Sequence, residues 1–493
     1  MLIWFLPVFL VFLMIGLPVF FGLLAAPGIL LWMNGQEKDI TLLYRNVYNG
    51  MDSFPLMAIP FFMLAGELMN KGGITERLVE FSQALMGHLR GGLAHVNILS
   101  SMLFAGLSGS AVADTSALGS MLIPAMEKQG YTRRFAAAVT AASSVIGPII
   151  PPSGIMIIYA YVMGESVAAL FLAGIVPGIL VGVGLMLVVR LLADRYDLPK
   201  AERIVKKGAP ISTVEAGFSF VLLRVMLGWL VYAIFMAATG IEAGTAVQWG
   251  ALAVAVIAAH AFLMMMRSRV DPDFRIVTKK AVLPLMTPVI IMGGILIGVF
   301  TPTEAAAVAV LYAVIIGALV LRTLKMSELG EVLSRAAMTS AVVLLLVGAA
   351  MAFKTVVSLS YAPQILAEYI LSLSENPLIL LFLINVLLFI VGMFLDAGPA
   401  IIILGPILGP IFVDLGVHPV HFAIIMSVNL TVGLATPPMG LVLFVASSVS
   451  GEKVQTIARA ILPFLAVEIL VIFLITYIPA ISMTIPRLTG FVQ

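Results

Sequence analysis

The chain has 493 residues, of which 61% are hydrophobic and 11% are charged, and its formal net charge is +2. This composition excludes an ordinary soluble domain and predicts an all-α polytopic membrane protein, because apolar runs of about 20 residues recur along the whole chain. The absence of cysteine excludes disulfides, thiolate catalysis and metal sites with sulfur ligands.

The apolar runs predict membrane elements from the beginning of the chain to its end. A helix of about 20 apolar residues crosses a hydrocarbon core of about 30 Å. We expect the first run to be a retained membrane segment that forms either one kinked span or two short spans around Pro18. The predicted elements are 2–33, 54–70, 92–107 with 111–126, 135–164, 166–193, 218–240, 246–266, 281–299, 303–322, 335–358, 377–394 with 398–413, 420–450 and 456–479.

Basic residues divide the predicted loops into two sets. If the two paired elements are hairpins that enter and leave the membrane on one side, alternate loops carry most of the 27 Lys and Arg residues. Loops rich in Lys and Arg stay in the cytoplasm, which predicts that this set is cytoplasmic. The opposite loops carry only Lys38, Arg45 and Arg487.

Two stretches of the chain repeat each other. GPIIPPSG ends at Gly154 and GLATPPMG ends at Gly440, and the match extends back without a gap to Gly106 and Gly392. The shared residues include many glycines and prolines, which set backbone geometry and match by chance less often than Leu, Val or Ala. An odd number of predicted crossings separates the two copies, so the second copy is predicted to be upside down. This is the inverted-repeat plan of secondary transporters.

The first copy predicts a helical hairpin followed by a broken helix. The hairpin turns at 108–110, and each arm of about 15 residues, roughly 22 Å long, is too short to cross the membrane. Non-helical backbone at that depth needs protein or water around it, and its carbonyls, with the Ser108 and Ser110 hydroxyls, suit a hard monovalent cation. Gly147 and Pro151 break the following helix close to Ser143. A kink that only improves packing is the alternative interpretation.

The second copy predicts a matching hairpin turn and break, with an acidic residue at the turn. Asp396 falls where the repeat places Ser110, and Asn429 corresponds to Ser143. A carboxylate inside a membrane is costly unless it is paired, so Asp396 is predicted either to bind an ion or proton or to cap the following helix, and one residue can do both. Asp114 either faces its own arm of the first hairpin or forms only local hydrogen bonds.

The sequence has no motif for ATP use or for catalysis. It lacks a Walker motif, a dinucleotide-binding loop and a Ser/His/Asp arrangement, so we predict that the protein is not an enzyme and has no cofactor. The alternatives are a stand-alone ion-coupled transporter of the same plan and an intramembrane hydrolase that uses Asp114 with Asp396. A purely structural subunit would not need oxygen ligands at two buried turns.

Five segments together resemble the large membrane subunit of the tripartite ATP-independent periplasmic (TRAP) transporters. They are FPLMAIPFFMLAGELMNKGGI, GLSGSAVADTSALGSMLIPAM, GPIIPPSG, FTPTEAAAVAVLYA and NLTVGLATPPMGLVLFV. The resemblance covers about 2–199 and 277–480, whereas 208–275 departs from the usual pattern and is predicted to be a two-helix insertion.

The resemblance implies an elevator mechanism driven by a sodium gradient in the bacterial inner membrane. It also implies a small membrane subunit of about four helices, a periplasmic substrate-binding protein and an organic acid substrate such as a C4-dicarboxylate, sialic acid or a sugar acid, with no nucleic acid involved. The implied first sodium site is Ser108, Gly109, Ser110, Ser143, Gly147 and Pro151; the second is Gly392, Asp396, Asn429, Thr431, Gly433 and Thr436; substrate-pocket candidates are Asp114, Thr115, Ser153 and Pro438.

These expectations divide the chain into seven parts. They are 1–90, first-repeat scaffold helices; 91–165, first hairpin and broken helix of a transport domain; 166–207, a helix and cytoplasmic linker; 208–275, the insertion; 276–376, second-repeat scaffold helices; 377–451, second hairpin and broken helix of the transport domain; and 452–493, the C-terminal helix.

Overall fold

The computed structural model describes residues 8–492 except 10, 13, 34, 36, 200–210, 240–244, 360–367, 369–373 and 375. Every regular element in this part of the chain is a helix. By length and apolar composition, nine of the described helices can cross a membrane, or ten if the bent pair Leu43–Met51 and Phe54–Lys71 is one span. The polytopic all-α class is therefore confirmed. The beginning of the predicted 2–33 run and residues 200–207 of the predicted cytoplasmic linker lie outside the described residues.

The N-terminal part contains two helices where the sequence predicted connections. The structure forms α2 (Val19–Met33), α3 (Glu37–Met51), η1 (Phe54–Met57), α4 (Ala58–Lys71) and α5 (Ile74–Met86). Helices α3 and α5 are amphipathic and too polar to read as spans. Leu43 of α3 packs against Ala352 and Val356, and Ile74 and Leu78 of α5 are buried. Apolar residues at helical spacing thus fold these segments onto the protein.

Two series of four helices contain the predicted turns and breaks. The first comprises α6 (Gly92–Ser108), α7 (Ala111–Lys128), α8 (Arg133–Ser144) and α9 (Gly154–Met163). The second comprises α17 (Pro377–Phe394), α18 (Ala397–Asp414), α19 (Pro419–Gly433) and α20 (Leu441–Ser450). Both breaks fall at the predicted Gly and Pro residues, and the peptide bonds before Pro152 and Pro438 are cis.

The arms of the first hairpin are longer than predicted. Instead of about 15 residues, α6 has 17 and α7 has 18. In the second hairpin, α17 and α18 match the predicted 377–394 and 398–413 to within one residue at each end. At 1.5 Å per residue, 18 residues span roughly 27 Å, and α17 and α18 are long and apolar enough to cross a membrane. Neither α6 nor α7, the arms that were predicted to be too short to cross, is among the nine described helices of that kind.

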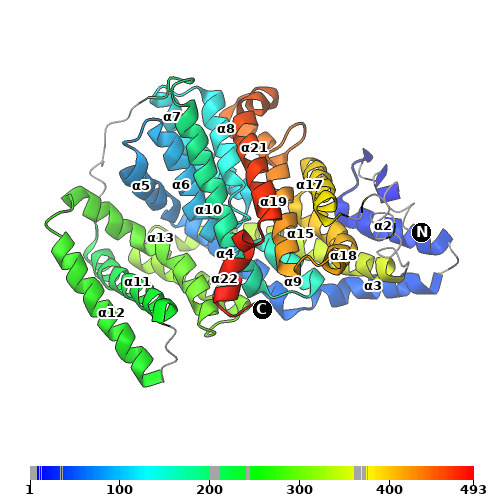
Figure 1. Ribbon diagram of the computed structural model, residues 1–493, viewed down its shortest axis with the longest axis horizontal. Helices are drawn as coiled ribbons and strands as arrows, with labels where there is room; N and C mark the ends of the chain where they lie inside the picture. Colours follow the sequence, from blue (N-terminus) through cyan, green and yellow to red (C-terminus); the bar gives the residue numbers. More distant parts are fainter. Residues whose placement is uncertain are drawn as a thin grey trace.

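The remaining helices surround these two series. They are α10 (Val167–Leu192), α11 (Thr213–Thr239), α12 (Thr245–Met266), α13 (Pro272–Leu296), α14 (Pro302–Val314) with a π-helical end (Ile315–Val320), η3 (Met326–Glu328), α15 (Leu329–Leu359), α21 (Val454–Tyr477) and α22 (Ala480–Leu488). Figure 1 shows α6, α8, α10, α21, α19 and α17 standing side by side, with α11 and α12 at one edge of the molecule and α2 and α3 at the other.

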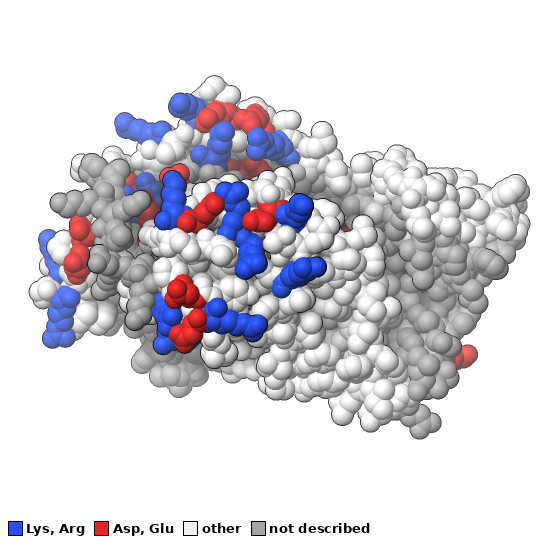
Figure 2. Space-filling view, turned by 90° about the horizontal axis from the view of Figure 1, so that it is seen from above, with Lys and Arg blue, Asp and Glu red and all other residues white. Residues whose placement is uncertain are grey.

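Charged side chains gather at one end of the molecule, which is the end viewed in Figure 2. Several loops that the charge pattern assigns to the cytoplasm are joined there by ion pairs. Arg90 pairs with Asp194, and Lys71 pairs with Glu328 at 3.7 Å. The structure therefore brings together loops that the positive-inside rule places on one side.

Candidate functional site

The first hairpin turn lies directly on the first break. Gly109 ends α6 with a φ of 60°, in the left-handed region. A Cβ atom at this position would lie 2.6 Å from the carbonyl oxygen of Pro152. Ser110 then caps α7, because its Oγ accepts a hydrogen bond from the Ala113 amide at 3.4 Å. Both the backbone conformation and the close contact explain why glycine occupies the turn.

Asp114 lies between this turn and the break. Its side chain is fully buried and accepts a hydrogen bond from the Ser108 hydroxyl. Its other oxygen, Oδ2, is buried and has no hydrogen-bond partner among the described residues. This oxygen lies so close to Gly147 that a Cβ atom on Gly147 would collide with it. The structure thus brings Ser108, Gly147 and Asp114 together, whereas the sequence argument left the role of Asp114 open and placed it outside the first cation site.

The other residues proposed for the first site have partners of their own. The Ser143 hydroxyl accepts a hydrogen bond from Ser101 at 2.9 Å and donates toward Asn97 and the carbonyl of Thr140. Pro151 is buried within the break. These contacts tie α8 to α6 beside the break and hold the two segments in register.

The second turn and break meet through their glycines. A Cβ on Gly433 would lie 2.5 Å from the Cα of Gly392, so α17 and α19 contact each other backbone to backbone. Asn429 donates to the Asn385 side chain at 2.6 Å and to the Ile425 carbonyl at 2.8 Å. Thr431 and Thr436 each donate to the carbonyl four residues earlier in the chain. Their hydroxyl protons are therefore used locally, and their oxygen lone pairs stay available.

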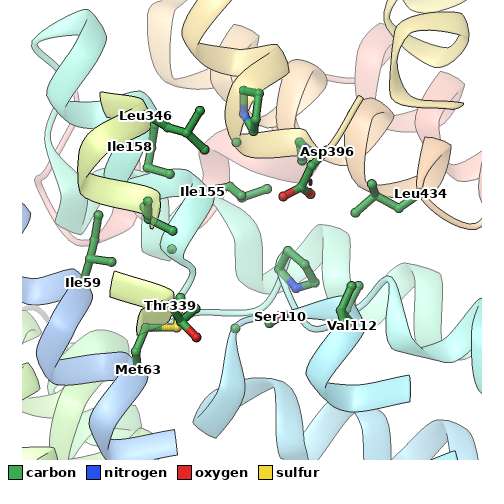
Figure 3. A pocket seen from close by; sticks show the side chains of 18 of the residues that line it. Ile59, Met63, Ser110, Val112, Ile155, Ile158, Thr339, Leu346, Asp396 and Leu434 are labelled. Carbon is green, nitrogen blue, oxygen red and sulfur yellow. Dashed lines mark hydrogen bonds between the residues drawn. The ribbon is translucent and has the colours of Figure 1, made fainter. Parts of the chain in front are cut away.

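Asp396 occupies a different environment from Asp114. It caps α18, because its Oδ1 accepts a hydrogen bond from the Ala397 amide at 2.8 Å. Its side chain is exposed to a cavity and points into it, as Figure 3 shows. The predicted capping role is present in the structure, and the predicted ion-binding role stays a prediction.

A cavity of about 160 Å³ lies where three helices begin. Its lining includes the first residues of α7, α9 and α18, and the α4 and α15 side chains close its other side (Figure 3). A helix N-terminus carries a partial positive charge and free amide groups, so three of them together favour an anion. The polar side chains of the lining are Ser110, Thr339 and Asp396, and no Lys, Arg or His is among them.

The four substrate-pocket candidates do not line this cavity. Asp114 and Thr115 are buried behind it, and Thr115 donates to the Ser144 hydroxyl at 2.7 Å. Ser153 caps α9 and donates to the Pro148 carbonyl, and Pro438 is exposed elsewhere. Sequence reasoning missed the contributions of Met63 from α4 and Thr339 from α15, since no local pattern marks a contact between segments this far apart.

Comparison with known proteins identifies the family. A family model described as "Tripartite ATP-independent periplasmic transporter, DctM component" matches residues 6–270 and 220–481. The sialic acid TRAP transporter large permease protein SiaM of Vibrio cholerae is 37% identical over 477 residues, which cover 96% of this chain and 95% of that protein.

Two further relatives match over nearly the whole chain. The C4-dicarboxylate TRAP transporter large permease protein DctM of Pseudomonas aeruginosa is 35% identical over 469 residues, covering 95% of this chain and 94% of the relative. The isethionate TRAP transporter permease protein DctMQ of Oleidesulfovibrio alaskensis is 37% identical over 476 residues, covering 96% of this chain and 65% of the relative.

These matches confirm the resemblance carried by the five sequence segments. The chain is a multi-pass permease of the bacterial inner membrane and not an enzyme. It belongs to the DctM component family, the large permeases of the tripartite ATP-independent periplasmic transporters.

Proposed function

We propose that this chain is the large transmembrane subunit of a sodium-coupled TRAP transporter that imports an organic acid by an elevator movement. In this proposal the two four-helix series, α6–α9 and α17–α20, form an inverted repeat and carry the substrate past a scaffold that includes α4 and α15. The hairpins enter the membrane from opposite sides and return, and they face the broken helices at the depth of the substrate.

The observation that carries the proposal is the cavity at the beginnings of α7, α9 and α18. Three helix N-termini supply amide groups and partial positive charge to a cavity that has no basic side chain in its lining. Such a site favours a carboxylate over a cationic solute once the proposed sodium ion at the second site neutralises the Asp396 carboxylate in the lining. The named substrates of the relatives above, which are sialic acid, C4-dicarboxylates and isethionate, are all anions.

The proposed sodium sites lie on either side of this cavity. The first uses oxygen atoms of the 108–110 turn and of the break near Gly147, and the orphaned Oδ2 of Asp114 adds a charged ligand. The second uses the turn at Asp396 and carbonyls and hydroxyls of the 429–436 segment. Hard cations prefer oxygen ligands, and a carboxylate oxygen without a hydrogen-bond donor favours binding of a cation.

The proposed partners are a small membrane subunit of about four helices and a periplasmic substrate-binding protein. The family description includes the words tripartite and periplasmic, which supports a three-component system. This chain covers only 65% of the relative named DctMQ, so that protein contains a further segment. We propose that a separate protein supplies the corresponding segment here.

Uptake into proteoliposomes tests the proposal. The purified chain is reconstituted with its small subunit, and accumulation of labelled C4-dicarboxylate, sialic acid and sugar acids is measured with and without an inward sodium gradient and the binding protein. We expect accumulation of one class only when both are present. Accumulation without the binding protein would identify a stand-alone transporter instead. Accumulation that is the same with and without the sodium gradient would contradict sodium coupling.

A further inference from the structure

Glu468 is a carboxyl group buried in the middle of α21 that no part of the proposed sodium or substrate sites uses. It lies about 21 Å along the helix from Val454, at 1.5 Å per residue. Its relative exposure is 0%, and neither of its oxygen atoms has a hydrogen-bond partner among the described residues. An ionisable residue in such a position in a membrane helix indicates a functional role.

The neighbouring residues of α21 show that Glu468 faces the protein interior. One turn earlier, the ring of Phe464 packs against Phe135 of α8, with 5.9 Å between their centroids. The adjacent Val467 packs against Gly184 of α10. A Cβ atom added to Gly184 would lie 2.6 Å from the Cγ1 atom of Val467. Helix α21 also packs against α19. Glu468 therefore lies on the helix that contacts both α8 and α19, the two helices that precede the breaks.

No described counter-charge lies near Glu468. Helices α17 and α20, which also pack against α21, carry no ionisable side chain. The nearest charged residue on α21 is Arg459, about 13.5 Å away along the helix. The ionisable groups of the packed elements all lie toward the ends of their helices. They are Arg133 and Arg134 of α8, Arg190 of α10, His421 of α19 with the N-cap His418, and Arg487 of α22.

The polar residues beyond Glu468 are already paired. Two turns later Thr476 donates to Asn385 at 3.1 Å, and its carbonyl lies 3.3 Å from a ring nitrogen of His421. They belong to the network that includes Asn429. They therefore offer Glu468 no free donor in this conformation.

We propose that Glu468 is a proton-binding site, distinct from the two sodium sites, which holds one proton in this conformation and exchanges it with water when the packing of α21 against α8 and α19 changes. A buried carboxylate without a cation or a donor is far more costly than a neutral carboxyl group, so the proton stays bound while the site is closed. A rearrangement that admits water or a cation removes this cost and releases the proton to the aqueous phase.

Infrared difference spectroscopy tests the bound proton without any need for transport. Glu468→Gln keeps the shape of the neutral acid, and Glu67→Gln, in the membrane helix α4, is the matched control. At neutral pH we expect the wild-type spectrum to contain the carbonyl band of a protonated carboxyl group that is missing from E468Q and present in E67Q. A difference spectrum that shows loss of a carboxylate band instead would overturn the proposal.

Uptake under an imposed pH gradient tests whether proton exchange accompanies transport. This second test rests on the proposed transport function, whereas the infrared test does not. A protein without the proposed transport function would therefore still show the infrared band if Glu468 holds a proton. With the sodium gradient held constant, we expect wild-type and E67Q uptake to change several-fold with the pH gradient and E468Q uptake to be insensitive. The sodium concentration for half-maximal uptake should be the same in all three. An unchanged pH response in E468Q would contradict proton exchange at this residue.

Discussion

At the scale of single residues, the two carboxylates nearest the cavity have different surroundings. Asp114 is fully buried, and its Oδ2 has no partner among the described residues, whereas Asp396 caps α18 and opens into the cavity. The repeat aligns Asp396 with Ser110, so the acidic groups occupy non-equivalent positions in the two copies. Two sodium sites built around them are therefore expected to differ in affinity.

The first prediction concerns the charge of Asp114. Asp114→Asn keeps the shape and the hydrogen bond from Ser108 but removes the charge of the proposed sodium ligand, and a tenfold loss of affinity corresponds to about 1.4 kcal/mol. We expect the sodium concentration for half-maximal uptake to rise at least about tenfold. Asp414→Asn, an exposed acid at the end of α18, is the control. An unchanged sodium dependence in D114N would exclude Asp114 as a ligand.

The second prediction concerns the close packing of the first turn. Gly109→Ala places a Cβ beside the Pro152 carbonyl and adds the cost of a left-handed residue, roughly 1–2 kcal/mol. Gly130→Ala, with a φ of 92° and nothing within 4 Å, adds only the conformational cost. We expect thermal unfolding in detergent to occur at a lower temperature in G109A than in G130A. Equal unfolding temperatures would show that the turn does not pack against the break.

At the scale of elements, the helix pair α11 and α12 is attached to the rest of the protein through packing on α13 and an ion pair with α5. Helices α11 and α12 pack against each other, and α11 packs against α13, while much of their surface is exposed. Arg77 of α5 pairs with Glu215 of α11, and their side chains are only 17% and 6% exposed. A buried ion pair stabilises a structure mainly because removing one partner leaves the other charge unpaired.

The third prediction follows from this ion pair. Arg77→Ala leaves Glu215 buried without a cation, so we expect a clear drop in the temperature of thermal unfolding. The double variant R77A/E215A removes both charges and should recover much of the loss. If the single and double variants unfold alike, the ion pair does not hold α11 against α5.

Glycine and proline made the turns and breaks predictable from the sequence. Gly109, Gly147 and the Pro-Pro pairs restrict the backbone locally, so their effect is visible without tertiary contacts. The arms of the first hairpin were predicted too short because helix ends depend on local capping, and α7 continues from its N-cap Ser110 to Lys128. Helices α3 and α5 were missed because their buried stripes are short and their polar faces lower the mean hydropathy.

The candidate site was harder to predict because its parts come from distant segments. Asp114 lies beside Gly147 only once α7 has packed against the break, and Thr339 reaches the cavity from α15. A single sequence contains no local pattern that predicts contacts between residues so far apart in the chain. The sequence therefore identified the residue types at the turns but not which of them face the cavity.

At the scale of the whole molecule, the cavity lies between the two four-helix series on one side and α4 and α15 on the other. An elevator movement requires these groups to slide past each other. The Lys354 ammonium of α15 donates to the Val162 carbonyl of α9, which places the two residues across this boundary. Because the chain has no cysteine, introduced pairs can be cross-linked without background.

Cross-linking across this boundary tests whether transport requires α9 to move past α15. The variant Lys354→Cys with Val162→Cys is treated with a short bifunctional maleimide, and sodium-driven uptake is measured before and after. Glu127→Cys with Arg133→Cys, within the first series, is the control pair. We expect cross-linking to abolish uptake in the first pair and to leave it unchanged in the control. Full uptake with α9 linked to α15 would contradict the movement on which the proposed transport depends.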